Sequence, residues 1–364
     1  MMRVELERAI LYVEENLEHD LSLNDVARHC NYSPYYLSVL FHQSVGETMK
    51  SYIKKRRLTC AAEELKKTDS SIIHIAITYG YSSQEAFSRA FTERFGVTPH
   101  KYRRTQTPIQ ETYPKHKSSF SKRGGEIMKD TIKNLQQKME ARYDVNILHV
   151  LNGSCMLERF SNEKLMNKNA TYVSFNEAMC WGEVDTELFS PAFIKARVQS
   201  LQTTEEEYRQ IVLEALDPLF KGDYGIIVLW FGDDMFCQIN MMTILAYLDQ
   251  TGYKGDVLFC MALERRDEML DHAFEMDSSG YLDIYRAVLC NRQKPEIDLL
   301  PVTYQAVHMY LNYRTSESPI VKYIKRNAGK ENLVAELLAL FPEYGLGDLQ
   351  YKMMIEEVAH EDKA

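Results

Sequence analysis

The feature that most constrains this 364-residue chain is a pattern of residues that occurs twice near its start. Val26-Ala27 and Asn31-Tyr32-Ser33 recur, 49 positions later, as Ile75-Ala76 and Gly80-Tyr81-Ser82. After one inserted residue, Leu37-Ser38, Phe41, Gly46, Thr48 and Tyr52 recur as Phe87-Ser88, Phe91, Gly96, Thr98 and Tyr102. Each copy predicts a short helix, a tight turn and a second helix that ends at a glycine. An internal repeat of this kind predicts two copies of one helical unit.

The second helix of the later copy has an apolar face and a polar face. Its apolar residues recur at helical spacing and are Ala86, Phe87, Ala90, Phe91 and Phe95. Its other side carries amide, hydroxyl and guanidinium groups, which read the edges of DNA bases. Such a helix is also common on ordinary protein surfaces. A bundle without a DNA role, however, has no need of two equivalent polar helices, so the repeat favours a DNA-binding helix-turn-helix.

The segment between the two copies predicts one helix, from about Glu47 to Lys67. About 20 helical residues at 1.5 Å each would hold the two units roughly 30 Å apart. One turn of DNA measures about 34–36 Å. Both second helices are therefore expected to enter successive major grooves on one side of the duplex.

A recognisable set of residues extends over much of residues 1–106. They are Ser33-Pro-Tyr-Tyr-Leu-Ser-Val-Leu-Phe41, Gly46, Tyr52-Ile53, Arg57-Leu58, Ala61, Ile75-Ala76, Gly80-Tyr81, Phe87-Ser-Arg-Ala-Phe91, Phe95-Gly96, Thr98-Pro99 and Tyr102-Arg103. With these residues the segment resembles the DNA-binding domain of the AraC/XylS family of bacterial transcription regulators. The resemblance implies an all-α double helix-turn-helix domain, with activation as the more common role.

By this resemblance, the second helix of each unit reads bases. The implied base-reading residues are Tyr35, Ser38 and Val39 in the first unit and Gln84, Glu85, Ser88 and Arg89 in the second. Many relatives carry arginine at the position of Val39, which pairs with Arg89 in the repeat. Arginine binds guanine through two hydrogen bonds, whereas valine offers only an apolar contact. The second unit is therefore expected to carry more of the sequence specificity.

Basic residues near both units are candidate contacts to DNA phosphates, which position a protein without specifying sequence. They are Lys50, Lys54, Lys55, Arg56, Lys101, Arg103 and Arg104. Arg57 is set apart as a candidate for a buried structural pair, and a charge run is also typical of a solvated face. Through Arg142 the chain has 23 Lys and Arg against 17 Asp and Glu, a net +6, and the remaining 20 basic and 35 acidic residues give −15. This asymmetry favours a DNA-facing part joined to an acidic part.

The composition changes after the repeat. Residues 107–129 are rich in Thr, Gln, Pro, Lys and Ser and predict a flexible basic linker. Residues 130–295 begin with a helix to Arg142 and then alternate apolar runs with helical stretches. The runs are Asn146–Leu151, Thr171–Phe175, Gly225–Phe231 and Asp256–Met261. This order predicts an α/β domain with a mostly parallel sheet, followed by a helical segment over residues 296–364.

Polar residues follow three of the expected strands. Ligands of parallel sheets bind beyond the carboxyl ends of the strands, so these residues are candidates for binding a small polar or cationic molecule. They are Asn152, Ser154, Asn176, Glu177, Asp233 and Asp234, with Trp181 nearby in sequence. Residues of these types also favour turns for reasons unrelated to a ligand.

The same region resembles an uncharacterised bacterial α/β domain, which implies no function. The shared segments are His149-Val-Leu-Asn-Gly153, Trp181-Gly182 and Leu229-Trp-Phe-Gly-Asp-Asp234. Regulators of the AraC/XylS type usually join DNA binding to a sensing or dimerising domain. The resemblance implies the same here, with the order of the two parts reversed from the usual one.

Other classes of protein find little support in the sequence. The charged start lacks a signal region, no apolar run spans a membrane, and the seven scattered cysteines fit reduced thiols. No catalytic, nucleotide-binding or metal-binding motif occurs. We therefore expect a cytoplasmic regulator, not an enzyme, with no cofactor and no membrane partner. The expected partners are promoter or operator DNA and an unknown small-molecule effector, with RNA polymerase and a second copy of the chain as further candidates. A DNA-tethered enzyme and a purely dimerising second domain remain the alternatives.

Overall fold

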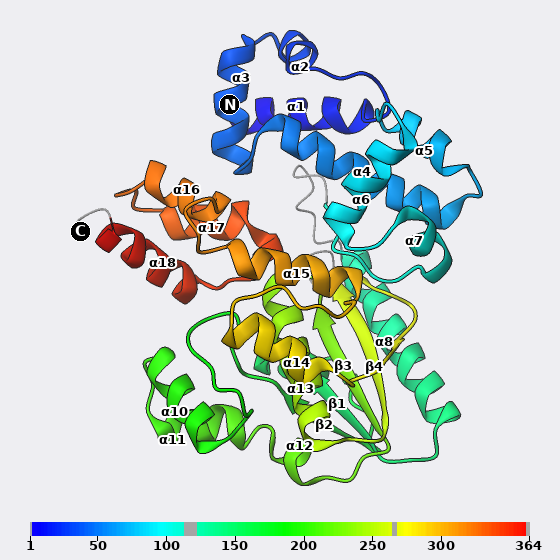
Figure 1. Cartoon of the computed structure of the whole chain (residues 1–364), viewed down its shortest axis with the longest axis vertical. Coiled ribbons are helices and arrows are strands. Elements are labelled where there is room, and N and C mark those ends of the chain that lie inside the picture. The colour runs from blue at the N-terminus through cyan, green and yellow to red at the C-terminus, as the bar shows by residue number, and fades with distance from the viewer. Residues whose placement is uncertain (1, 113–121, 264–267, 362–364) are drawn as a thin grey trace. The chain divides into compact units, whose positions relative to one another are not determined.

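The computed structural model describes residues 2–112, 122–263 and 268–361 (Figure 1). The chain divides into two compact units. Unit 1 contains Met1–Ser118, Leu299–Gln305 and Asn312–Ala364, and unit 2 contains Ser119–Asp298 and Ala306–Leu311. The multidomain architecture expected from the sequence is confirmed, with a helical N-terminal part and an α/β part.

The duplicated pattern folds as two helix-turn-helix units. They consist of α2 (Leu23–Cys30) with α3 (Pro34–Val45), and of α5 (Ile72–Thr78) with α6 (Gln84–Phe95). Asn31 (φ 59°) and Gly80 (φ 77°) occupy the same left-handed position in the two turns. Gly46 (φ 81°) and Gly96 (φ 71°) end α3 and α6 in the same way. The repeat therefore extends to the backbone conformations that start and stop the helices.

The long helix α4 (Met49–Lys67) belongs to two hydrophobic cores. Its first half supplies Met49, Tyr52 and Ile53 to a core formed with α1 (Met2–Glu15), α2 and α3. Its second half supplies Leu58, Ala61, Ala62 and Leu65 to a core formed with α5, α6 and α7 (Pro99–Thr105). Equivalent ring pairs, Phe41 with Tyr52 and Phe91 with Tyr102, pack at 5.5 and 5.4 Å. The expected connecting helix is thus present, and each unit has a core of its own.

The helices after residue 300 group mainly with the two helix-turn-helix units. They are α15 (Pro301–Asn312), α16 (Pro319–Arg326), α17 (Leu333–Leu340), the 3-10 turn η4 (Pro342–Tyr344) and α18 (Asp348–Glu361). A Cβ atom at Gly96 would lie 2.5 Å from the ring of Tyr304, and one at Gly46 would lie 3.0 Å from the ring of Phe341. The last turns of both second helices therefore lie against C-terminal side chains within unit 1.

The expected division into a linker and separate segments differs from the structure. Gln110, inside the expected linker, is buried and exchanges two hydrogen bonds with the Gln305 side chain, at 2.8 and 3.0 Å. The Val302 amide donates to the Pro108 carbonyl at 3.0 Å. Helix α8 (Lys122–Arg142) begins inside the expected linker as well, while residues 113–121 lie outside the described residues. Residues 107–112 are therefore part of unit 1, because their backbone finds partners there.

Unit 2 contains the expected sheet, with four parallel strands. The described strands are β1 (Ile147–Leu151), β2 (Ala170–Ser174), β3 (Ile226–Gly232), β4 (Asp256–Leu263), β5 (Glu268–Met269) and β6 (Phe274–Met276). They run in the order β2-β1-β3-β4-β5, and β6 also pairs with β4. The pairs among β1 to β4 are parallel, whereas β5 and β6 are antiparallel to β4. The mostly parallel sheet predicted from the apolar runs is confirmed.

Helices cover the sheet (Figure 1). Ile226, Val228 and Trp230 of β3 share a core with α8 and with α9 (Ser154–Asn162). The alternate β3 residues point to the other face, and α13 (Met235–Thr251) packs against β3. The remaining elements are α10 (Pro191–Ser200), α11 (Glu205–Tyr208), the π-helix η1 (Arg209–Leu213), α12 (Asp217–Lys221), α14 (Tyr281–Tyr285) and the π-helix η3 (Arg286–Cys290). A strand order that reverses between β1 and β3 places the expected ligand position beyond the ends of those two strands.

Candidate nucleic-acid interface

The second helix of each unit is fixed at its start by a serine. The Ser33 hydroxyl accepts a hydrogen bond from the Tyr36 amide at 3.2 Å, and Ser83 accepts one from the Ala86 amide at 3.1 Å. Such caps satisfy backbone donors that a helix start leaves unpaired. Leu37 and Phe87 then anchor the inner faces of the two helices, each with no exposed surface. The caps and anchors together orient the opposite faces outward.

The predicted base-reading residues lie on these outward faces. Tyr35 is 82% exposed and Val39 is 38% exposed, and Ser38 is exposed beside them. On α6, Gln84, Glu85 and Arg89 are exposed and Ser88 is half-buried. The structure thus brings each set together on one helix face. Sequence reasoning did not include Tyr36, which is 45% exposed and packs its ring 4.9 Å from that of Tyr32.

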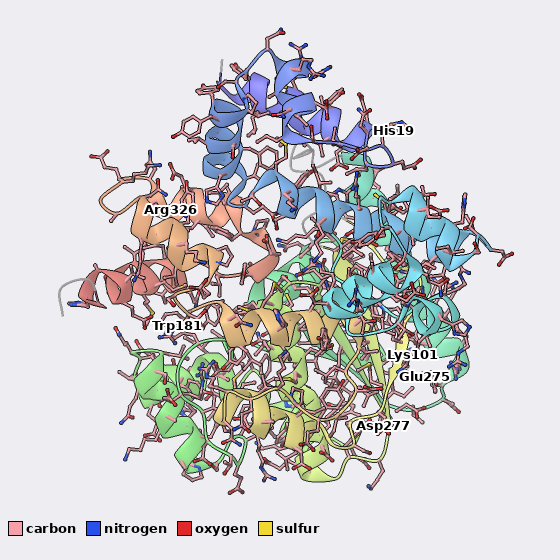
Figure 2. The ribbon with its side chains drawn as sticks, turned by 45° about the horizontal axis from the view of Figure 1, so that its top comes forward. His19, Lys101, Trp181, Glu275, Asp277 and Arg326 are labelled. Atoms are coloured by element: carbon pink, nitrogen blue, oxygen red, sulfur yellow. The ribbon has the colours of Figure 1, made fainter. Side chains whose placement is uncertain are left out.

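Four of the predicted phosphate contacts are exposed lysines and arginines. They are Lys50, Lys54, Lys101 and Arg104, and Lys101 is labelled in Figure 2. The Lys54 ammonium lies 3.7 Å from the Glu93 carboxylate. Lys55 is half-buried and pairs with Glu47 at 2.9 Å. A phosphate would compete with a carboxylate for these two lysines.

Arg56 is a correction to the sequence prediction, because its side chain does not reach the surface. It is 7% exposed, and it grips the Glu14 carboxylate with Nε at 2.9 Å and Nη2 at 2.8 Å. A further N–H donates to the Thr112 carbonyl. Burial disfavours its charge, yet Glu14 outweighs burial and raises the pKa of Arg56. Arg56 therefore joins α1, α4 and the chain after α7.

Two further arginines bind backbone carbonyls. Arg57 donates to the carbonyls of Leu17 and His19 at 2.8 and 2.7 Å. Arg57 thus has a structural role, but it is half-buried and bonds to backbone carbonyls rather than forming the expected buried pair. Arg103, a predicted phosphate contact, donates to the carbonyls of Leu65 and Ser70 at 3.3 and 2.5 Å. Arginines that cap the ends of helices in this way stabilise otherwise unpaired carbonyls.

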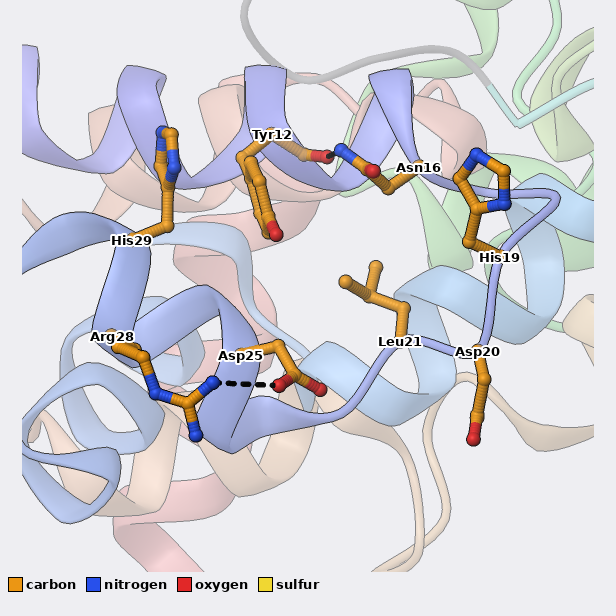
Figure 3. Close-up of a pocket in the computed structure, with 8 residues that line it drawn as sticks. All are labelled: Tyr12, Asn16, His19, Asp20, Leu21, Asp25, Arg28 and His29. Carbon is orange, nitrogen blue, oxygen red and sulfur yellow. Dashed lines mark hydrogen bonds and ion pairs between the residues drawn. The ribbon is translucent and has the colours of Figure 1, made fainter.

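A hollow of about 440 Å³ lies beside the first unit (Figure 3). Arg28 and Asp25, one turn apart on α2, pair at 3.4 Å on one side of it, and the Asn16 side-chain amide donates to the Tyr12 carbonyl at 2.8 Å. The His29 ring stacks on Tyr12 with the centroids 4.0 Å apart. The lining mixes acidic and basic groups, so it favours neither charge in a ligand.

In unit 2, several of the predicted ligand residues form hydrogen bonds with one another or with neighbouring elements. The Asn152 amide donates to the Cys237 sulfur at 2.9 Å. The Asn240 side chain joins the Asn152 carbonyl oxygen, at 3.4 Å, to the Glu177 backbone carbonyl, at 2.7 Å. Ser154 donates to Asn176 at 2.9 Å. The ends of β1 and β2 are thus tied to α13 through Asn152, which the sequence singled out for binding, and through Asn240, which it did not.

Glu177 corrects the prediction of a ligand contact at this position. Its carboxylate accepts from Arg197 at 3.1 and 2.8 Å, from the Tyr208 hydroxyl at 2.5 Å and from the Ala178 amide at 2.8 Å. The side chains of Glu177 and Arg197 are both 0% exposed. Burial opposes the charge of Arg197, but Glu177 outweighs it and raises the pKa of Arg197. Burial, followed by the charge of Glu177, raises the pKa of Tyr208. The carboxylate is saturated by protein donors and positions α10 and α11.

The remaining predicted ligand residues are also largely structural. Asp234 caps α13 by accepting from the Cys237 amide at 2.9 Å. Trp181 and Asp233 are buried, at 4% and 3% exposure. Within the described part of the chain, no group of three or more His, Cys, Asp and Glu could hold a metal ion. No helix in that same part is long and apolar enough to cross a membrane.

Comparison with known proteins concerns the first part of the chain. A family model described as a helix-turn-helix domain matches residues 11–105. The Transposon Tn10 TetD protein of Escherichia coli is 44% identical over 97 residues, which are 27% of this chain and 70% of that protein. The HTH-type transcriptional activator AarP of Providencia stuartii is 37% identical over 98 residues, 27% of this chain and 73% of that protein. A solved AraC-type transcriptional regulator from Chromobacterium violaceum is 32% identical, with a TM-score of 0.28, and covers 28% of this chain and 92% of its own.

Proposed function

The chain belongs to the AraC/XylS family of DNA-binding transcription regulators, and we propose that it binds promoter DNA through α3 and α6 in two successive major grooves. The observation that supports this most is the equivalence of the two outward helix faces. Both helices start at a capping serine, end at a left-handed glycine and present exposed side chains opposite a buried face. Helix-turn-helix proteins dock their second helix in this manner.

The two faces differ in what they offer to a base. Arg89 on α6 is exposed and presents a guanidinium, which binds guanine through two hydrogen bonds. Its counterpart on α3 is Val39, which offers only an apolar surface, suited to the methyl group of thymine. Tyr35 and Ser38 on α3, and Gln84, Glu85 and Ser88 on α6, complete the proposed base-reading set. We infer that α6 carries most of the sequence specificity.

Binding to a set of operator variants tests this assignment. The operator is first located by mapping the promoter DNA that the full chain protects in cells. Arg89→Ala is expected to lose about 1–3 kcal/mol of discrimination at one base pair. Arg104→Ala is the matched control, because loss of an exposed phosphate contact should weaken binding to all variants alike. A uniform loss for Arg89→Ala would refute the base-reading assignment.

We propose further that the chain activates transcription and that its remaining parts modulate DNA binding. The relative AarP is named as a transcriptional activator, which supports activation as the direction of regulation. Contact with RNA polymerase is the proposed output. Tyr304 and Phe341 lie against Gly96 and Gly46 within unit 1. Movement of these C-terminal side chains would therefore act on the ends of α6 and α3. A small-molecule effector bound by unit 2 and a second copy of the chain are the proposed inputs. Reporter expression from the mapped promoter, with and without the gene for this chain, tests the direction of regulation.

A further inference from the structure

Unit 2 has a second hollow, of about 810 Å³, away from the strand-end residues singled out by the sequence. It is lined by side chains from the start of α10, from η1, from α12 and from the end of α13. Its apolar part consists of the rings of Phe189, Phe220 and Tyr247 together with three aliphatic side chains, Leu188, Ile194 and Leu213. Its volume falls in the range of about 300–1,000 Å³ typical of small-molecule sites.

The three rings form one cluster. Phe189 lies 5.0 Å from Phe220 and 5.1 Å from Tyr247, and the third pair is 5.4 Å apart, all between ring centroids. Each ring is only half-buried. The tilts of 59°, 85° and 71° bring ring faces and edges together at one surface. Half-buried rings in contact with one another leave aromatic surface available to a bound molecule.

The backbone at Phe189 is held in an unfavourable conformation. Its φ of 58° is left-handed, which is a genuine outlier for a bulky residue. The side chain of Gln250 grips the residue before it, accepting from the Leu188 amide at 2.8 Å and donating to the Leu188 carbonyl at 3.1 Å. The residue after it, Ser190, caps α10. Strain that the surroundings enforce from both sides is a mark of binding sites.

A second part of the lining, formed by η1, is irregular as well. Arg209 and Leu213 line the hollow from the π-helix η1, a form of helix that is frequent at functional sites. Asn176 donates to the Ile211 carbonyl of this π-helix at 2.8 Å, and Tyr208, just before it, donates to Glu177. The strand-end residues therefore hold the wall of the hollow in place.

Charges around the hollow favour a cation. Residues 203–223 contain six acidic side chains and two basic ones. Both basic side chains are engaged, since Arg209 pairs with Glu206 at 2.6 Å and with Glu214, and Lys221 pairs with Asp217 at 2.6 Å. Glu214 and Asp217 lie on the rim of the hollow together with these two partners, so the surplus of negative charge comes from the other four carboxylates of the segment. The surplus of carboxylates raises the local concentration of cations and repels anions.

We propose that this hollow binds an organic cation with an aromatic or apolar body. The body lies on the rings of Phe189, Phe220 and Tyr247, and the positive centre lies over the ring faces near Glu214 and Asp217. Aromatic faces attract cations, most strongly where water is excluded. Calling this ligand an effector rests on the proposed function as a regulator. Binding of the cation does not, because it needs no DNA.

Calorimetric titration of the full chain with two ions of the same shape and opposite charge tests the proposal. The probes are tetraphenylphosphonium, a cation, and tetraphenylborate, an anion. The cation is expected to bind one site at least about tenfold more tightly than the anion, and Glu214→Gln should weaken only the cation, by about three- to tenfold. Equal or tighter binding of the anion, or no binding of either ion, would overturn the proposal.

Variants of the rings locate the bound cation. Phe220→Ala is expected to lower the affinity for the cation by about tenfold or more. Phe274→Ala, which removes a half-buried ring from β6, should leave that affinity unchanged. Unchanged binding in Phe220→Ala would place the cation elsewhere and refute the site. Fluorescence of the two buried tryptophans checks that unit 2 stays folded in each variant. All of these titrations contain no DNA, so their failure leaves the DNA-binding proposal untouched, and loss of operator binding leaves this site untouched.

Discussion

Replacing Arg197 by methionine should strongly destabilise unit 2. All five N–H groups of this guanidinium donate, two to Glu177 and the others to the carbonyls of Trp181, Glu183 and Ala178, at 2.6 to 3.1 Å. Methionine keeps much of the side-chain volume but leaves the Glu177 carboxylate buried without its counter-charge. Removing one partner of a buried ion pair costs about 3–5 kcal/mol. We expect a loss of that size in the free energy of unfolding.

Tryptophan fluorescence during urea unfolding reports this loss from unit 2 alone. The chain has two tryptophans, Trp181 and Trp230, and both are buried in unit 2. Arg142→Met is the matched control, because Arg142 pairs with Glu275 at 3.0 Å while both side chains remain mostly exposed. An exposed pair of this kind contributes about 0–1 kcal/mol. The midpoint of unfolding should therefore fall far more for Arg197→Met than for the control.

A double variant separates the ion pair from simple loss of packing. Arg197→Met combined with Glu177→Leu removes both charges, so it should recover part of the stability that Arg197→Met loses. The reasoning is refuted if Arg197→Met costs no more than the Arg142→Met control. It is also refuted if the double variant is no more stable than Arg197→Met alone.

Three further predictions concern pH, salt and backbone geometry. Burial lowers the pKa of His149 to about 3, and its Nδ1 accepts a hydrogen bond from the Trp230 indole at 2.9 Å. The stability that neutral His149 contributes above pH 6.5 should therefore fall towards pH 3, with a loss of about 2 kcal/mol at pH 5. His149→Gln should flatten this pH dependence in urea titrations. Lys50→Ala should reduce the slope of log affinity for DNA against log salt by about 1, whereas Arg56→Met should lower the melting temperature and leave the slope unchanged. Gly96→Ala should lower the melting temperature of unit 1, because its φ is 71° and the added methyl meets a tyrosine ring at 2.5 Å.

The helix-turn-helix units could be predicted because their signals are local. Ser22, Asn31 and Gly46 each act on the few residues beside them, through a cap, a left-handed turn and a helix stop. The main strands were predictable for a similar reason, since an apolar run such as that of β3 is buried on both faces. The strands β5 and β6 were missed, because two or three residues are too few to show a period.

Residues whose roles depend on distant partners were not predictable. The basic character of Arg56 suggested a phosphate contact, but its role is set by Glu14, 42 positions earlier. Glu177 follows a strand, where ligand-binding residues are expected, yet its carboxylate accepts hydrogen bonds from Arg197 and Tyr208. Sequence spacing gives no measure of which charged side chains will be buried together, since that depends on how separate elements pack.

The grouping of the C-terminal helices with the repeat also depends on contacts between distant residues, so the sequence did not predict it. Gln110 and Gln305 are 195 positions apart, yet both are buried and each satisfies the backbone or side chain of the other. A buried amide that lost such a partner would cost about 1–3 kcal/mol. These hydrogen bonds therefore fix the position of the segment after α7 against the start of α15, because any shift would leave buried polar groups without partners. Within unit 1, a change that shifts the start of α15 would be felt at Tyr304, whose ring lies against Gly96 at the end of α6.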